Sequence, residues 1–214
     1  MQYRTIANLN LYDSPNLNRL ATQAAVGRYV KILSDSPLQV MTCEDDYPGW
    51  LDPNDLKFLE KTETPYQAPI WTAEHIGDRI PEIIAFTQAA MSVPNQYLWG
   101  GTVAPNYDCS GLMQAAFASV GIRLPRDAYQ QEAFLQPVED LIPGDLVFFG
   151  TPEKATHVGL YLGDKRYIHS SGKDQGRNGI GIDQLLEEGD RVSRYYYALY
   201  RGAGRAIASY LPQC

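Results

Sequence analysis

The sequence predicts an α+β protein with two unequal domains. Residues 1–69 are rich in turn residues and carry only short alternating stretches, whereas helical patterns and then β-rich segments follow residue 80. Helices followed by strands within one domain are typical of the α+β class. A length of 214 residues leaves room for one large domain or two unequal ones.

The first expected domain, residues 1–69, is a small β-barrel. Alternation such as that of residues 38–43 (LQVMTC) is typical of a strand. Residues 62–70 (TETPYQAPI) carry two prolines, which stop helices and central strands alike. We therefore expect residues 62–70 to form a linker packed between two domains, the second of which spans residues 70–214.

Two helices open the second expected domain. We expect Pro81 to start the first helix, whose apolar residues recur at helical spacing, and Pro94 to end it. The next helix covers residues 109–120, with Asp108 in a capping position before it. Cys109 therefore falls at a helix N-terminus.

Four strands are expected to follow, at residues 145–150, 157–162, 166–170 and 195–201, because these segments are rich in β-formers. Two of the three histidines, His157 and His169, fall on consecutive strands. If residue 161 pairs with residue 165, the two rings lie directly opposite each other. A two-residue turn without a bulge would instead put them on opposite faces of the sheet.

Composition and cysteine spacing set the expected partners and location. Acidic residues outnumber basic residues by 25 to 18, so we expect neither nucleic acid nor an anionic membrane as a partner. No signal-peptide pattern and no run of about 20 apolar residues occurs, so neither a leader nor a membrane span is expected. Cys43, Cys109 and Cys214 are a poor disulfide framework, and the expected location is therefore the cytoplasm.

Cys109 is the candidate nucleophile. A thiol attacks as a thiolate, and the N–H groups and dipole of a helix N-terminus favour that form. A lone cysteine is usually a small buried hydrophobic residue, but Asp108 and Ser110 flank this one and Gly111 follows. Glycine inside a helix is costly unless the backbone approaches something closely. A second glycine-rich segment, residues 97–101 (YLWGG), adds an aromatic face, and together they predict a cleft.

The two strand histidines complete a candidate catalytic set. His157 would take the proton of the Cys109 thiol and later give it to the leaving amine, while His169 would hold the imidazole of His157 in the required tautomer. Two alternatives remain: structural histidines, or a zinc site made of these three residues. No C-x-x-C pair or H-E-x-x-H helix supports zinc, and we expect no metal and no cofactor. The residues alone indicate a thiol hydrolase or acyltransferase.

Five motifs follow one another along the chain: residues 97–101 (YLWGG), 108–111 (DCSG), 143–146 (PGDL) and 157–163 (HVGLYLG), and then His169. In this order they resemble the NlpC/p60 family of bacterial cell-wall cysteine peptidases, and the match covers roughly residues 80–200. The resemblance implies a papain-like fold, a triad of Cys109, His157 and His169, and Tyr97 near the oxyanion site.

The N-terminal domain resembles a bacterial SH3-like domain. Residues 10–15 (NLYDSP) and 43–51 (CEDDYPGWL) are similar to those of cyanobacterial members that hydrolyse γ-D-glutamyl-diamino acid bonds in murein peptides with a free N-terminal L-Ala. That subgroup implies that Asp108, Ser110 and Tyr47 help to bind the amine end of the substrate.

Two positions depart from that subgroup or align with it loosely. Asp13 is a weaker candidate for the amine end, because the alignment is loose there. Ala128 stands where many relatives carry a serine shortly after the conserved arginine, here Arg126, so a polar contact from that point is not expected.

The expected function is therefore that of a cysteine endopeptidase acting on small murein peptides, L-Ala-γ-D-Glu-diamino acid, during cell-wall peptide recycling. The resemblance implies meso-diaminopimelate as the diamino acid. Two other functions stay open from the sequence: a catalytically silent murein-binding module, and a cysteine amidase or transferase acting on another γ-glutamyl substrate.

Overall fold

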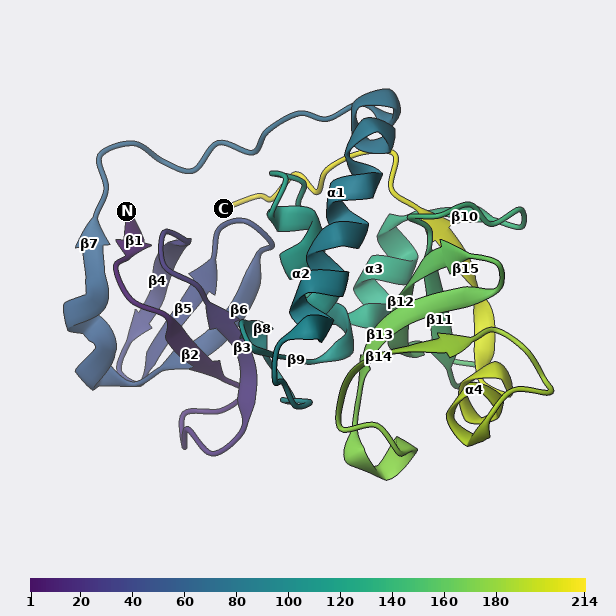
Figure 1. The fold of residues 1–214 in the computed structure, drawn as a ribbon. Helices are drawn as coiled ribbons and strands as arrows, with labels where there is room; N and C mark the ends of the chain where they lie inside the picture. The colour runs from purple at the N-terminus through teal and green to yellow at the C-terminus, as the bar shows by residue number, and fades with distance from the viewer.

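Two β-sheets flank a layer of helices in the computed structural model, which describes residues 1–214 (Figure 1). The first sheet is wholly antiparallel, with strand order β3-β2-β6-β5-β4-β1-β7. Its strands are β1 (Gln2–Thr5), β2 (Leu9–Tyr12), β3 (Leu20–Ala24), β4 (Tyr29–Asp35), β5 (Leu38–Thr42), β6 (Tyr47–Leu51) and β7 (Leu59–Lys61), with the short helix η1 (Pro53–Phe58) before β7.

Alternating burial in the first sheet creates a separate small core. In β5, Leu38 and Val40 are buried while Gln39 between them is partly exposed, as expected for a strand with one face inward. Leu11 and Leu51 face each other across β2 and β6. The core consists of Leu9, Leu11, Ala24, Val30, Leu38, Val40 and Leu51.

The segment between the sheets, residues 62–72, has no helix or strand. It runs along the outer side of the molecule from β7 to α1 (Figure 1). It links the two domains and contacts both. The backbone N–H of Tyr66 donates to the side chain of Gln2 in the first domain (2.6 Å), and the indole N–H of Trp71 donates to the carbonyl of Gly121 in the second (3.1 Å).

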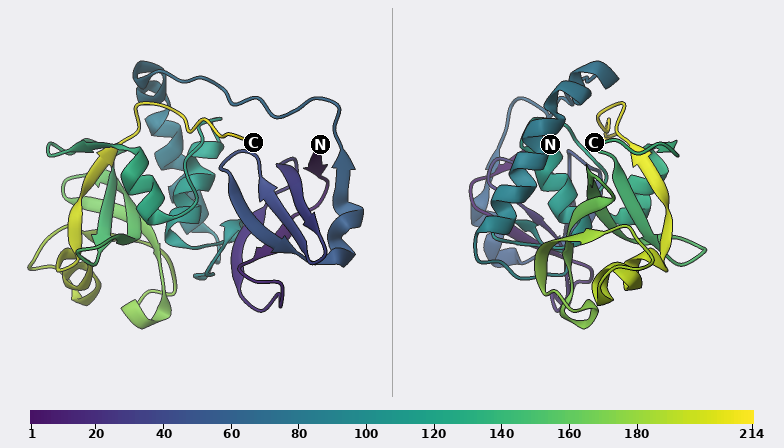
Figure 2. Two further views of the ribbon diagram at one scale, coloured as in Figure 1. Left: turned by 180° about the vertical axis from the view of Figure 1, so that it is seen from behind. Right: turned by 45° about the vertical axis from the view of Figure 1, so that its right-hand side comes forward.

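The second sheet has six strands in the order β10-β15-β11-β12-β13-β14, and helices cover it on both faces (Figure 2). The helices are α1 (Ala73–Ser92), α2 (Cys109–Ala118), α3 (Ala128–Phe134), α4 (Arg191–Tyr197) and the short η2 (Lys173–Gln175). The strands are β8 (Thr102–Val103), β9 (Asn106–Tyr107), β10 (Gln136–Val138), β11 (Leu146–Gly150), β12 (Ala155–Gly163), β13 (Arg166–Ser171), β14 (Gly179–Gln184) and β15 (Tyr200–Arg205), of which β8 and β9 form a separate hairpin.

Two apolar clusters sandwich this sheet. The larger joins α1 and α2 to the sheet through residues such as Leu112, Phe117 and Val158. The smaller lies on the other face, where Val192 and Tyr196 of α4 pack on the sheet. The larger cluster holds α2, which begins with Cys109, against β12.

Helix α1 starts earlier than expected. Thr72 caps it by accepting a hydrogen bond from the N–H of His75 (3.3 Å), and Pro81 lies inside the helix. The expectation that Pro81 opens the helix is wrong because the N-terminal cap decides where the helix begins, while an internal proline removes only one backbone hydrogen bond.

The expected strand at residues 195–201 is correct only for its last two residues, which begin β15. Residues up to Tyr197 belong to α4, which begins after Asp190, whose side chain accepts from the N–H of Ser193 (2.8 Å). Consecutive tyrosines favour strands, but here Tyr196 points into the smaller core. Strand β14 and helix α3 were not expected from the sequence.

Helix α2 and β8 hold the first domain in place. The side-chain amide of Gln114 in α2 donates to Asp45 (2.8 Å), and the N–H of Thr102 donates to the side chain of Gln23 (3.1 Å).

None of the helices combines the length and apolar character needed to cross a membrane.

A disulfide adds a covalent link between the domains. Cys43, at the end of β5, is bonded to Cys214, and the segment after β15 runs back to the first domain to reach it (Figure 1). The expectation that the cysteines are too scattered to pair is therefore wrong, because 171 residues of sequence separation say nothing about distance in the folded chain.

Candidate active site

Cys109 is the first residue of α2 and lines a cleft of about 340 Å³ between the two domains. Its side chain is largely buried, and the backbone at Val158 and Ser110 donates hydrogen bonds to the thiol. The cleft is lined by Asp13, Arg19, Leu20, Ala21, Tyr47, Tyr97, Trp99, Asp108, Cys109, Ser110, Arg126, Asp127, Ala128, Tyr129, Lys154, Ala155 and Thr156.

The position of Gly111, in the first turn of α2, has no room for a side chain. A Cβ at this position would collide with the backbone carbonyl of Gly101. The segment before β8 therefore packs directly on the first turn of α2. This close backbone approach brings Tyr97, three residues before Gly100, to the same cleft as Cys109.

The Cys109 thiol is neutral at rest. Burial and, to a smaller extent, the nearby carboxylate of Asp108 raise its pKa to about 12, although hydrogen bonds from Val158 and Ser110 oppose the shift. The expectation of a lowered thiol pKa is therefore wrong: removal from water outweighs the helix N-terminus. A base is required to remove the proton at the moment of attack.

The register of β12 and β13 sets the position of the two histidines. Tyr161 pairs with Tyr167, two positions away from the expected pairing of residues 161 and 165. The hairpin turn has two residues, Asp164 and Lys165, both with left-handed backbone angles, as in a type I′ turn. Leu162 is the extra residue of a bulge between Tyr161 and Gly163.

This bulge decides on which face each histidine lies. Without it the two-residue turn would put His157 and His169 on opposite faces. With it they are diagonal neighbours on one face, and Nε2 of His157 lies 2.6 Å from Nδ1 of His169. The expectation that the two rings lie directly opposite each other is therefore wrong. The expectation that a bulge can bring them to the same face is confirmed.

The two imidazoles are buried and uncharged. Burial lowers the pKa of His157 well below its usual value, and neighbouring His169 lowers it further. Burial likewise lowers the pKa of His169, although Asp183 opposes that shift. His157 and His169 are therefore both neutral at neutral pH, and His157 is free to accept a proton.

Two further residues contact these rings and were missed in the sequence. Asp183 of β14 lies 2.7 Å from Nε2 of His169 and is bound in turn by Arg177. Tyr196 of α4 lies with its ring against His157. The available sequence signal for Asp183 was its place two residues after the second glycine of residues 179–184 (GIGIDQ). No sequence signal distinguishes Tyr196 from the other tyrosines, of which the chain has fifteen in all.

Asp108 and Ser110, on either side of Cys109, share one buried partner. Both guanidinium nitrogens of Arg126 reach Asp108 (2.6 and 3.2 Å), and one also donates to the Ser110 hydroxyl (2.9 Å). The remaining Nε of Arg126 donates to Thr22 of β3, in the first domain (2.8 Å). Arg126 is only 1% exposed, and it joins the residues that flank Cys109 to the first domain.

The first domain supplies one wall of the cleft. The Tyr47 hydroxyl donates to Asp127 (3.5 Å), and burial raises the pKa of both residues. Asp13 also lines the cleft and pairs with Arg19 (3.7 Å). Burial and proximity to Cys109 raise the pKa of Tyr97, so its hydroxyl stays protonated and can donate a hydrogen bond.

The cleft thus brings together Tyr97, Asp108, Cys109, Ser110 and Tyr47, while His157 and His169 are buried in the sheet and do not line the cleft. No group of three or more His, Cys, Asp or Glu side chains is arranged to hold a metal ion.

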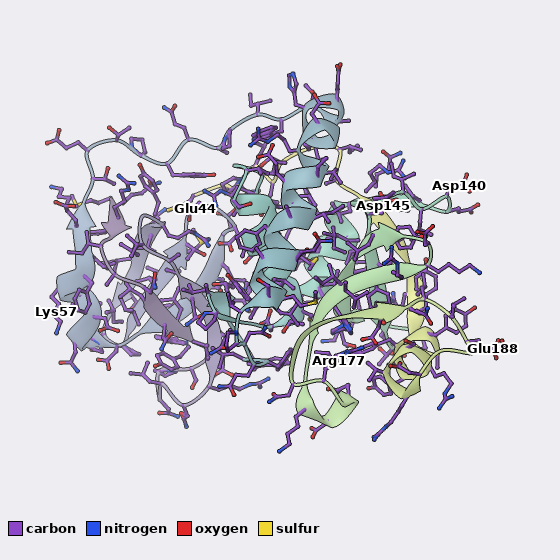
Figure 3. The ribbon with its side chains drawn as sticks, viewed as in Figure 1. Glu44, Lys57, Asp140, Asp145, Arg177 and Glu188 are labelled. Carbon is purple, nitrogen blue, oxygen red and sulfur yellow. A yellow bond between two sulfur atoms is a disulfide. The ribbon has the colours of Figure 1, made fainter.

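The PGDL motif lies elsewhere. Asp145 (Figure 3) is buried and accepts two hydrogen bonds from Arg205 (2.7 and 2.9 Å), which ties β11 to β15. This part of the family pattern therefore holds the sheet together and does not line the cleft.

Comparison with known families and proteins agrees with this geometry. The NlpC/P60 family model matches residues 94–198, and the bacterial dipeptidyl-peptidase SH3 domain model matches residues 11–56. The γ-D-glutamyl-L-lysine dipeptidyl-peptidase of Bacillus subtilis is 42% identical over 79 residues, which cover 35% of this chain and 27% of that protein. A probable endopeptidase of Mycobacterium tuberculosis is 42% identical over 98 residues, 44% of this chain and 24% of that protein. The matches thus span only about a quarter of these relatives.

Solved structures show the same fold. An NlpC/P60 family protein from Bacillus cereus superposes with a TM-score of 0.73 over 97% of this chain and all of that chain, at 18% identity. The peptidoglycan hydrolase RipB from Mycobacterium tuberculosis superposes with a TM-score of 0.51 over 65% of this chain and 70% of that chain, at 24% identity. The expected α+β fold with a preceding SH3-like domain is confirmed, and the chain joins a peptidase domain of the NlpC/P60 family to a bacterial SH3 domain.

Proposed function

We propose that the chain is a cysteine endopeptidase that hydrolyses the γ-D-glutamyl–diamino acid bond of murein peptides whose N-terminal L-Ala is free. One observation carries the proposal: Tyr47, Asp13 and Leu20 of the SH3 domain line the same cleft as Cys109. When the scissile bond of a bound peptide lies at the Cys109 thiol, the N-terminal end of the peptide meets the wall formed by the SH3 domain. A short free N-terminus fits there, and a glycan-linked stem peptide does not.

The reaction follows from the neutral Cys109–His157 pair. His157 takes the thiol proton as the sulfur attacks the γ-carbonyl carbon of D-Glu, with Tyr97 donating to the carbonyl oxygen as it becomes negative. The C–N bond then breaks, and His157 passes the proton to the leaving amine of the diamino acid. Water hydrolyses the resulting thioester with His157 again as base, which regenerates the thiol.

The amine end is assigned to the carboxylates of the cleft. Arg126 already compensates Asp108, whereas Asp127 has no salt bridge and accepts only from the hydroxyls of Tyr47 and Tyr129 in the cleft. A positively charged α-amine between Asp108 and Asp127, against Tyr47 and Ser110, would restore charge balance there. Asp13 also lines the cleft but is already paired with Arg19.

Two finer points belong to the same proposal. The B. subtilis relative is named for a γ-D-glutamyl-L-lysine substrate, whereas meso-diaminopimelate follows from the resemblance of the motifs. A cleft closed to long N-terminal extensions suits small recycled muropeptides, and a cytoplasmic location stays a prediction.

The test compares kcat/KM for L-Ala-γ-D-Glu-meso-diaminopimelate with that for its N-acetyl form. Wild type should prefer the free amine by about two orders of magnitude, because acetylation leaves a desolvated carboxylate unpaired. Tyr47→Ala and Asp108→Asn should lower the ratio of kcat/KM for the free-amine substrate to that for the N-acetyl form. Asp164→Asn, in the exposed β12–β13 turn, should leave this ratio unchanged. Product masses should be those of L-Ala-D-Glu and free diaminopimelate.

Cleavage of both substrates within about threefold would contradict the assigned amine site. Absence of any murein cleavage, with Cys109 still reactive toward alkylating agents, would instead favour another γ-glutamyl substrate.

A further inference from the structure

Three residues on adjacent strands form a diagonal series across one face of the second sheet. His157 is on β12, His169 on β13 and Asp183 on β14. His169 pairs with Gly181, two residues before Asp183, so Asp183 is its diagonal neighbour just as His157 is on the other side. The series ends at Arg177, which stands beside these strands in Figure 3.

Glycines stand beside His169 on both neighbouring strands and leave room for this arrangement. A Cβ on Gly159 would come within 3.2 Å of the Cβ of His169, and one on Gly181 would lie 2.7 Å from Cδ of Arg177. The Arg177 side chain therefore lies across Gly181 to reach Asp183. A larger residue at 181 would displace the arginine.

Asp183 is a buried, ionised carboxylate. Its Oδ2 accepts from His169 (2.7 Å) and from Nε of Arg177 (2.9 Å), and its Oδ1 is bound by Nη2 of the same arginine. Burial alone would raise the pKa of Asp183, but the hydrogen bonds from His169 and Arg177 lower it to about 2. Tyr167 and Tyr196 also contact the His169 ring, but burial raises the pKa of both, so they carry no charge.

An ionised carboxylate sets the order of protons along the series. It has no proton to donate, so Nε2 of His169 must carry one. A neutral His169 then has a bare Nδ1, and the 2.6 Å contact requires a proton on Nε2 of His157. Nδ1 of His157 is consequently bare and is the atom left to accept the proton of Cys109.

We propose that Asp183, held by Arg177, is a positioning residue that fixes the tautomers of His169 and His157 so that Nδ1 of His157 can act as the base. When the S–H bond of Cys109 breaks, its proton moves to this nitrogen. The imidazolium is stabilised through His169 by the carboxylate, which itself stays ionised throughout. The inference rests on the proposed cysteine-peptidase chemistry but not on the murein substrate.

Asp183→Asn is the decisive variant because it keeps the shape and removes the charge. Both oxygens of Asp183 accept from Arg177, so an asparagine that keeps its oxygen at Nη2 of Arg177 places its amide nitrogen where Oδ2 lay. That nitrogen faces Nε2 of His169 and requires it to be bare, while Nε of Arg177 loses its acceptor. His169 then carries its proton on Nδ1, and His157 carries its own on Nδ1. A base that is already protonated at the reacting atom cannot take the thiol proton, so kcat should fall by two to four orders of magnitude, with KM within about threefold.

The readouts are the ¹⁵N shifts of the two imidazoles and the rate of Cys109 alkylation by iodoacetamide. Cys109 is the one free cysteine of the chain, which keeps the alkylation rate simple to interpret. Asp183→Asn should exchange the protonated and bare nitrogens of both rings and slow alkylation at least tenfold. Asp174→Asn, a matched change in the exposed η2 segment, should alter neither. Arg177→Gln should cost less than Asp183→Asn and keep the wild-type tautomers.

Two outcomes would overturn the inference. One is an Asp183→Asn enzyme with kcat within threefold of wild type. The other is a wild-type protein whose His157 carries its proton on Nδ1, a result that needs no variant to fold. If the tautomers are as expected but the protein does not cleave murein peptides, the result would contradict the proposed function and leave this inference intact.

Discussion

The ring of Tyr196 stacks on the imidazole of His157, with 4.2 Å between the centroids and 23° between the planes. The tyrosine hydroxyl is bonded to Ser171 on β13 (2.7 Å). Helix α4 thus covers one side of the proposed base and contributes to its burial, and burial is the main reason why the pKa of His157 is low.

The effect of the stacked Tyr196 ring can be separated from that of its hydroxyl group by two substitutions. Tyr196→Phe keeps the stacked ring and should leave kcat within about threefold of wild type. Tyr196→Leu admits water, so the His157 pKa measured by NMR titration should rise toward its usual value. A Tyr196→Leu enzyme with an unchanged His157 pKa would show that the stack does not shield the base.

Loss of the catalytic groups should be severe and non-additive. Cys109→Ala and His157→Ala should each abolish turnover, and the double variant should be no worse, because the residues act as a unit. His169→Ala should be milder, since it removes an orienting group. Circular dichroism checks the fold, and activity in Cys109→Ala above a tenth of wild type would refute the assignment.

The pH profile should follow His157 on the acid side. The base works only when neutral, and its pKa is lowered, so kcat/KM should rise with pH below 6.5 and be flat through neutrality. The Cys109 pKa of about 12 places any loss from thiol ionisation far above neutral pH. A fall in activity between pH 7 and 8 would contradict the neutral pair, and inhibition by EDTA would revive the zinc alternative.

The Cys43–Cys214 disulfide should raise the melting temperature. Closing a loop of 171 residues stabilises a protein by up to about 5 kcal/mol in the chain-entropy account. Cys214→Ser should therefore lower Tm by on the order of 10 °C, and a reducing agent should then have no further effect. Cys109→Ala, which removes a thiol outside the disulfide, is the matched control.

The redox state of this pair in cells also tests the expected location. A cytoplasmic protein should yield Cys43 and Cys214 as free thiols on rapid alkylation of cells, because that compartment keeps thiols reduced. Recovery of the oxidised pair would contradict the cytoplasmic prediction.

Local patterns predicted the elements around the nucleophile well. Asp108 caps α2 as expected because capping depends on neighbours in the sequence. The histidine register depended on one bulge at Leu162, which no local signal marks, so the expected pairing was two residues off.

Arg126 and Asp183 were not assigned roles because their partners come from other strands or from the other domain. Arg126 meets Thr22, which is 104 residues away in the sequence. Helix α4 did carry a local signal, Asp190 three residues before Ser193, but the β-propensity of the tyrosines concealed it.

The hydrogen bond from Arg126 to Thr22 limits how freely such domains can be recombined. A different SH3 domain grafted onto this peptidase domain would have to offer an acceptor where the Thr22 hydroxyl lies. Without it, a buried guanidinium that also holds Asp108 and Ser110 would lose one of its partners. The graft would then disturb the residues on both sides of the nucleophile, although its own boundary lies far from Cys109 along the chain. The unit that can be exchanged is therefore the pair of domains together.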